Sequence, residues 1–182
     1  MGKKLTVLIA FCGILILSFQ ENWAIEAVQK KENHLVDYKS KPEAYWKKNL
    51  SGEAYKVCRQ QGTEPAFLGT YDKFYEKGTY TCACCGGDYP LYSSKAKFDS
   101  KTGWPSFWEP IDPSHIVLAK DTSLIHQFLG ARTEVQCARC GSHLGHVFDD
   151  GPPPTGKRYC MNSVALHFVP EGQTPKRTFP AE

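Results

Sequence analysis

The pattern of apolar and polar positions divides the chain into a leader, a polar stretch and a body. The leader contains an uncharged, largely apolar run from Leu5 to Phe19, which follows the lysine pair at positions 3 and 4. This run is shorter than the ~20 residues that a membrane-spanning helix needs, and residues 22–24 offer a signal-peptidase site. The pattern therefore predicts a signal peptide over residues 1–24, with an uncleaved membrane tether as the alternative.

The pattern changes twice after the leader. Residues 25–41 are polar and rich in lysine, which predicts a linker. The segment 42–67, "PEAYWKKNLSGEAYKVCRQQGTEPAF", predicts two short helices. Pro42 suits a first helical position, Ser51 caps the second helix and Gly62 ends it.

From Phe67 onward, short runs rich in Tyr, Phe, Thr and Val are separated by Gly, Pro and Asp. Such runs are typical of antiparallel strands with irregular connections. Two of them flank "EKG" at 76–78, which predicts a hairpin there. We therefore expect a mainly β domain over residues 42–170, entered through the two helices and followed by a loose polar tail over 171–182.

Length and charge narrow the class of protein. A chain of 182 residues is long enough for one well-buried domain. Its formal net charge is only +3, and acidic and basic residues are mixed along it. A nucleic-acid surface would need clustered Lys and Arg, so we expect no nucleic-acid partner.

Four cysteines form two C-x-x-C pairs, Cys82 with Cys85 and Cys137 with Cys140, and each pair is followed by glycine. Four thiolates can surround one tetrahedral Zn²⁺ and leave no open position for a substrate. Because 51 residues separate the pairs, more than the ~15–20 of a zinc ribbon, the spacing predicts one structural zinc ion that joins two distant β segments. Disulfides within or between the pairs, or a redox role for either pair, are the alternatives, and Cys84 is expected to be a spectator thiol.

A second cluster follows in "HLGHVFDDGPPPTGKRYCMNS", residues 143–163. It brings two imidazoles, a carboxylate and a guanidinium close in sequence to the thiol of Cys160. Such neighbours can lower the pKa of a thiol or move protons during a reaction at sulfur. By spacing alone, His143 and His146 are better explained as buried hydrogen-bonding residues, or as ligands of a second metal, than as catalytic residues.

Three segments together resemble one family: "YKVCRQQGTEPAF", "KFDSKTGWPSFWEPI" and "RTEVQCARCGSHLGHVFDDGPPPTGKRYCMNS". They look like the methionine-R-sulfoxide reductases (MsrB), and the likeness runs from about Tyr45 to Pro170. The resemblance implies a fold of two antiparallel sheets and a structural zinc on the two C-x-x-C pairs. It also implies an oxidoreductase that reduces methionine R-sulfoxide, mainly in proteins, to methionine.

The resemblance also implies the roles of individual residues. Cys160 would be the nucleophile, which takes the oxygen of the sulfoxide and becomes a sulfenic acid. The other catalytic residues would deliver a proton to that oxygen or hold the site's water, and they are His143, His146 and Asn162. The substrate-binding residues would wall a methyl pocket or orient the reacting groups, and they are Trp104, Asp150 and Arg158.

Recycling of the nucleophile departs from a common family pattern, because Thr102 stands where that pattern places a resolving cysteine. The candidates are Cys58, Cys84 and an external thiol. We favour Cys58 as a further catalytic residue, because a flexible N-terminal arm can bring its Cα within the ~4.4–6.8 Å of Cys160 that a disulfide needs. Thioredoxin or an exported dithiol protein would then reduce the Cys58–Cys160 disulfide.

Together these expectations describe an exported protein-repair enzyme of oxidative stress, in a periplasm or a secretory compartment. The alternative from another class is a catalytically inactive, zinc-stabilised binding module. That alternative requires Cys160 to be blocked or the two histidines to be displaced. A zinc-ribbon nucleic-acid binder fits less well, because the two C-x-x-C pairs are too far apart and the net charge is low.

Overall fold

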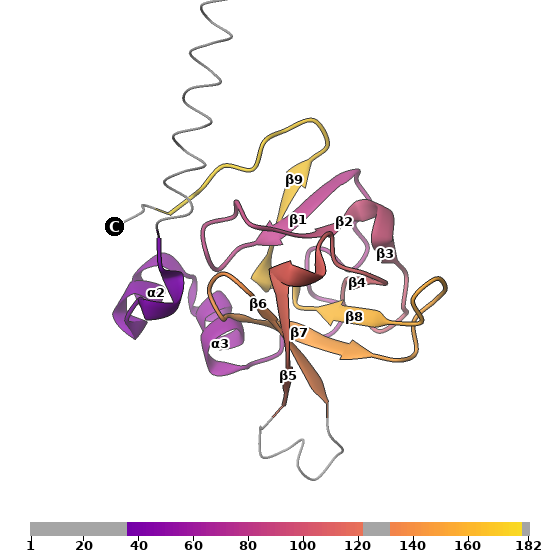
Figure 1. Cartoon of the computed structure of the whole chain (residues 1–182), viewed down its shortest axis with the longest axis horizontal. Coiled ribbons are helices and arrows are strands. Elements are labelled where there is room, and N and C mark those ends of the chain that lie inside the picture. The colour runs from indigo at the N-terminus through magenta and orange to yellow at the C-terminus, as the bar shows by residue number, and fades with distance from the viewer. Residues whose placement is uncertain (1–35, 122–131, 180–182) are drawn as a thin grey trace, which may run out of the picture. The chain divides into compact units, whose positions relative to one another are not determined.

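The structure, a computed structural model, describes residues 36–121 and 132–179. The predicted signal peptide and most of the predicted linker lie outside these residues. The described residues form a mainly β domain with two antiparallel sheets and two short N-terminal helices, as predicted (Figure 1). Within the described ranges, no helix is long and apolar enough to cross a membrane.

The two predicted helices are present as α2 (Glu43–Asn49) and α3 (Gly52–Gln60). Ser51 caps α3, as predicted: its hydroxyl accepts a hydrogen bond from the backbone N–H of Ala54 at 3.1 Å. The helix ends at Gln60, two residues before Gly62, because Gln61 takes the left-handed conformation with φ 55°. The buried face of α3 packs against β7 (His143–Phe148) and the short 3-10 helix that follows Asn162.

The smaller sheet has β1 (Gly78–Cys82) in the middle, between β2 (Pro90–Ser93) and β9 (Leu166–Pro170). The hairpin predicted around residues 76–78 is wrong, because the segment before it forms turns and both edges of β1 are already paired. Phe74, in that segment, instead packs its ring on Phe168, with ring centroids 4.7 Å apart.

The larger sheet positions the chemically interesting residues. β7 lies between β6 (Thr133–Cys137) and β8 (Arg158–Met161), and all neighbouring strands are antiparallel. The order across the sheet is β3 (Lys97–Phe98), β4 (Ser106–Phe107), β8, β7, β6 and β5 (Ile116–Lys120).

Aromatic side chains fill the core between the sheets. Phe107 is fully buried and stacks on Tyr92 with ring centroids 4.5 Å apart. Tyr80 meets the same ring edge-on at 5.0 Å. Because these residues come from β1, β2 and β4, the contacts join the smaller sheet to the larger one.

Both ends of the described domain differ from the predicted boundaries. Tyr38, in the last part of the predicted linker, is fully buried, so the folded unit begins at Asp37 rather than at residue 42. The tail is not loose over its described part, since Thr178 donates its backbone N–H to the carbonyl of Gly86 at 2.7 Å. Arg177 also lies near Asp88, with 3.5 Å between Nε and a carboxylate oxygen.

Candidate active site and metal centre

Cys160 lies on β8, in the middle of a row of residues that crosses the larger sheet. It is directly opposite His146 on β7 and Ser106 on β4, and His146 is in turn opposite Glu134 on β6. Directly opposed residues of antiparallel strands project from the same face. The fold therefore places a thiol beside an imidazole that is 14 positions away in the sequence.

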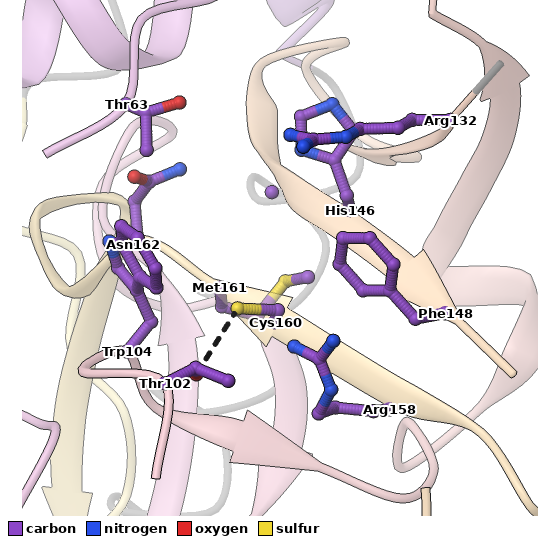
Figure 2. Close-up of a pocket in the computed structure, with 11 residues that line it drawn as sticks. Thr63, Thr102, Trp104, Arg132, His146, Phe148, Arg158, Cys160, Met161 and Asn162 are labelled. Atoms are coloured by element: carbon purple, nitrogen blue, oxygen red, sulfur yellow. Dashed lines mark hydrogen bonds between the residues drawn. The ribbon is translucent and has the colours of Figure 1, made fainter. Parts of the chain in front are cut away.

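The thiol lines a cavity of about 280 Å³ (Figure 2). Cys160 lies at its floor, with Trp104 and Asn162 on one side and His146 and Phe148 on the other. Cys160 is a free, partly buried thiol. The cavity is thus a small, partly aromatic chamber with one sulfur nucleophile at its base.

Opposing influences act on the Cys160 thiol. Burial raises its pKa, whereas the positive charge of Arg158 and hydrogen bonds from Thr102 and Ser106 lower it. Thr102 Oγ1 lies 4.0 Å from the sulfur (dashed line in Figure 2). The net result is a pKa above the ordinary thiol value. Of the groups that lower this pKa, Arg158 has the largest effect, and it therefore favours the thiolate most.

Each of the two predicted histidines is bonded to a buried carboxylate. His143 Nδ1 lies 2.7 Å from Glu134 Oε1, and His146 Nε2 lies 2.9 Å from Asp121 Oδ2. The hydrogen bond with His143 lowers the pKa of Glu134, although burial opposes this. Burial lowers the pKa of His146, and its bond with Asp121 opposes that shift.

The two histidines do not hold equivalent positions. His146 lines the cavity, whereas the buried His143 does not, and the two ring centroids are 5.2 Å apart. Among the described residues, His143 Nε2 has no hydrogen-bond partner. His146 is therefore the histidine that can exchange a proton with a bound molecule, and His143 is the one behind it.

Asn162 and Trp104 are held by one short loop. Asn162 accepts a hydrogen bond from the backbone N–H of Glu64 at 3.0 Å and donates to the carbonyl of Leu144 at 3.0 Å. The indole N–H of Trp104 donates to the carbonyl of Glu64 at 3.1 Å. The buried Glu64 carboxylate in turn accepts backbone N–H groups of Ser163 and Val164, so Glu64 fixes both side chains relative to β8.

Arg158 lines the cavity, but Asp150 does not. The two form a bidentate pair, with nitrogen–oxygen distances of 2.8 and 2.9 Å. The Asp150 side chain is 61% exposed and that of Arg158 is 11% exposed. Asp150 therefore acts on the site through the guanidinium that it orients.

The four cysteines of the two C-x-x-C pairs form a second centre. All four are buried, and their sulfurs lie within 4.8 Å of one another. Cys82 and Cys140 sulfurs are 3.8 Å apart, and those of Cys85 and Cys137 are 3.9 Å apart. A tetrahedron with metal–sulfur distances of ~2.3 Å has edges of ~3.8 Å, so the four thiols could hold one metal ion.

Cys58 is not where the recycling hypothesis needs it. It is buried in α3 and forms a disulfide with Cys84. The expected Cys58–Cys160 pair is therefore wrong for this structure, because α3 is a packed helix and not a flexible arm. Cys84 is likewise not a spectator, since it ties α3 to the loop that carries the first C-x-x-C pair.

Most of the site residues could be predicted from the sequence, but the residues that hold them in place could not. The structure gathers Cys160, His146, Asn162, Trp104 and Arg158 around one cavity. Three carboxylates of the site were not predicted from the sequence: Glu134 and Asp121, which bond the histidines, and the loop residue Glu64. For Glu134 a signal exists, because a charged residue inside the strand-like run "RTEVQC" needs a partner if it is buried. The other two lie in segments without such a pattern.

Comparison with known proteins places this geometry in a family. The sequence model of the SelR domain matches residues 50–170. A protein of Pseudomonas putida (strain W619) named peptide methionine sulfoxide reductase MsrB is 54% identical over 125 residues, which is 69% of this chain and 90% of the relative. The proteins of that name from Methanosarcina barkeri and Thiobacillus denitrificans are 55% and 53% identical over 131 residues, covering 72% of this chain and 88% and 95% of the relatives.

A matching SelR model over more than half of the chain, a β fold and a free thiol beside a histidine define the class as the SelR-domain proteins. Within that class, the relatives of more than 50% identity show that this chain belongs to the MsrB family.

Proposed function

We propose that this protein reduces the R-sulfoxide of methionine, mainly in proteins, to methionine. The observation that carries the proposal is the free thiol of Cys160 at the base of a small cavity, directly opposite His146 in the sheet. The relatives' printed name, peptide methionine sulfoxide reductase, supports the same reaction.

In the first step, the Cys160 thiolate attacks the sulfoxide sulfur. One proton is taken up, the oxygen passes to Cys160 as a sulfenic acid, and the methionine thioether leaves. The cysteine is oxidised by two electrons and the sulfoxide is reduced by two, so the step is balanced. The positive charge of Arg158 supports it by favouring the thiolate.

Oxygen transfer needs a proton, because a negatively charged sulfoxide oxygen is a poor leaving group. His146 faces the cavity and is the proposed proton donor. Asp121 bonds its ring and favours the protonated form, against the effect of burial. His143 and Asn162 would hold water in the site, and His143 acts from behind His146.

Trp104 supplies the proposed methyl pocket. Its indole is fixed by the hydrogen bond to the Glu64 carbonyl and lies across the cavity from His146. A flat aromatic surface favours contact with the methyl group bound to sulfur. Contacts to both the methyl group and the oxygen would let the site distinguish one sulfoxide epimer from the other.

An external thiol is the proposed resolving partner. Thr102 stands 4.0 Å from the Cys160 sulfur, where a hydroxyl cannot form a disulfide. Among the described cysteines, the remaining ones are buried in the metal cluster or in the Cys58–Cys84 disulfide. An incoming thiol would displace water from the sulfenic acid, and a second thiol would then release Cys160 as the mixed disulfide is reduced.

A dithiol protein of the thioredoxin type fits this sequence of steps, because it brings both thiols. We propose that the reaction takes place outside the cytosol, in a periplasm or secretory compartment; the support is the apolar leader and its cleavage pattern.

Zinc is the proposed metal of the four-cysteine centre. Four thiolates match its usual donor set, and Arg139 donates a hydrogen bond to the Cys85 sulfur at 3.3 Å, which offsets negative charge there. Bound zinc would supply structural cross-linking and no reaction step.

The free thiol at Cys160 and the position of His146 in the cavity argue against the inactive binding module, which needs one of the two to be blocked or displaced. The test is direct. Incubated with dithiothreitol and the separate epimers of a dabsyl-methionine sulfoxide, the protein should convert only the R epimer. Cys160→Ser should abolish turnover, while Cys84→Ala, which leaves the cavity intact, should not. Turnover that survives Cys160→Ser would disprove the nucleophile.

A further inference from the structure

The cavity carries a positive charge at its mouth that the proposed chemistry does not use. Arg132 lines the cavity and is exposed, immediately before β6. Figure 2 shows its side chain on the same side of the cavity as the His146 ring, across from Thr63. It touches the nearby residue Phe148, with the guanidinium carbon 5.9 Å from the ring centroid.

Two guanidinium groups therefore flank one aromatic ring. Arg158 lies on the other side of Phe148, with its guanidinium carbon 4.3 Å from the centroid. The ring lies within cation–π range of the buried Arg158 guanidinium near Cys160 and of the exposed Arg132 guanidinium at the mouth of the cavity. The cavity lining contains both arginines and no carboxylate.

The two cations differ in one respect. Arg158 already forms a bidentate pair with Asp150, and the buried carboxylates behind the rim, Asp121 and Glu134, each bond a histidine. Among the residues that the structure describes, Arg132 forms no ion pair or side-chain hydrogen bond with a carboxylate. Arg132 is therefore the guanidinium at the mouth of the cavity that can pair with a bound ligand.

We propose that Arg132 is a specificity-determining residue that favours substrates with a carboxylate beside the methionine sulfoxide. The inference rests on the proposed function. When the sulfoxide sulfur reaches the Cys160 sulfur, the neighbouring residues of the substrate peptide pass through the mouth of the cavity, where Arg132 lies. A carboxylate there pairs with the guanidinium, whereas an ammonium group is repelled.

The expected size of the effect is modest. Ion pairs at exposed sites contribute little, which corresponds to about a two- to fivefold change in affinity. We expect a glutamate next to the sulfoxide to raise kcat/KM by about two- to fivefold over glutamine, and a lysine to lower it by a similar factor. The preference should shrink in high salt, because exposed charges are screened.

The experiment uses blocked hexapeptides that contain one methionine R-sulfoxide. One set varies the preceding residue and another the following residue, each among Glu, Gln and Lys. A third set compares a terminal carboxylate with its amide, which separates a side-chain carboxylate from that of a chain end. The measured quantity is kcat/KM in low and high salt.

Three variants test whether Arg132 causes the preference for Glu over Lys next to the sulfoxide. Arg132→Gln should bring the Glu-to-Lys ratio to near one, and Arg132→Lys should keep a clear preference for Glu. Lys120→Gln is the matched control: it removes one positive charge from the exposed end of β5, opposite Thr133, and so from the other face of the sheet. It should leave the ratio unchanged.

Two results would overturn the inference. One is a wild-type ratio of one in every set. The other is a ratio that Arg132→Gln leaves intact, even if all rates fall, since that pattern reports a merely structural role. Failure of the wild-type protein to reduce any of these peptides would instead overturn the proposed function, and this inference with it.

Discussion

At the scale of single residues, the reactivity of Cys160 depends on a competition between burial and charge. Burial raises the pKa of the thiol, and the Arg158 guanidinium lowers it. Arg158 is itself held by Asp150 through two hydrogen bonds. The proposed attack needs the thiolate, so the rate should depend on how well Arg158 offsets burial.

Replacing Arg158 with methionine should raise the pKa of Cys160 further. Less thiolate then forms at neutral pH, and alkylation of Cys160 by iodoacetamide should slow by about three- to tenfold there. The rate should recover as pH rises, because the thiolate form returns above the raised pKa. Peptide mass spectrometry across pH 6.5–9.5 would measure it (about the range in which thiols titrate).

Two further variants separate charge from packing. Arg158→Lys keeps the positive charge and should retain most of the wild-type profile. Asp150→Asn removes a negative charge at an exposed position, so the alkylation profile should move to lower pH. A profile that stays in place in Arg158→Met would show that Arg158 does not set the thiol's reactivity.

The residue types of the site could be predicted from the sequence, but most of their partners could not. The thiol, two histidines, indole and arginine are close in sequence or lie in recognisable motifs. Asp121 reaches the site because the preceding strand β5 pairs with β6 in the larger sheet, and Glu64 because the loop after α3 packs against the residues that follow β8. No local pattern encodes those two contacts, since each joins segments far apart in the chain.

At the scale of elements, the prediction of a hairpin around residues 76–78 is wrong because strand pairing joins segments that are far apart in the chain. Alternating aromatic and polar residues suit a strand, but β1 already has β2 and β9 on its two edges. Helix capping is local, and Ser51 was accordingly predicted as the cap of α3. The environment of Cys58 on that helix was not, because it depends on the distant Cys84.

The Cys58–Cys84 disulfide should stabilise the placement of α3. It closes a loop with a sequence separation of 26, which in the chain-entropy picture corresponds to roughly 3.5 kcal/mol. Cys58→Ala should therefore lower the melting temperature by about 10 °C, measured by circular dichroism, while turnover with dithiothreitol continues.

Cys84→Ala is the matched variant, because it removes the same bond from the other side. The two single variants and the double variant should melt at similar temperatures, since all three lack one and the same cross-link. Thioredoxin-dependent turnover should also be equal in both single variants. A selective loss of that turnover in Cys58→Ala would restore Cys58 as a resolving cysteine.

At the scale of the whole domain, the four-cysteine centre joins parts that are distant in sequence. Cys82 ends β1 of the smaller sheet, and Cys137 ends β6 of the larger sheet. Arg139, next to the second pair, contacts Tyr38 near the start of the folded unit, at 5.0 Å from guanidinium carbon to ring centroid. The centre therefore fastens both sheets and the N-terminal segment together.

Removing one ligand should loosen this whole junction. Cys137→Ser leaves three thiols, so we expect the zinc content to fall from about one ion per chain to near zero. Because metal binding of this kind is also folding free energy, the melting temperature should fall by more than about 10 °C. Atomic emission and thermal melting measure both quantities. Cys84 lies in the loop that carries the first C-x-x-C pair but outside the four-cysteine cluster, so Cys84→Ala should keep its zinc. A structural role for zinc would be refuted if Cys137→Ser had the same melting temperature as Cys84→Ala. It would also be refuted if wild-type protein purified without metal were as stable as the zinc-loaded protein.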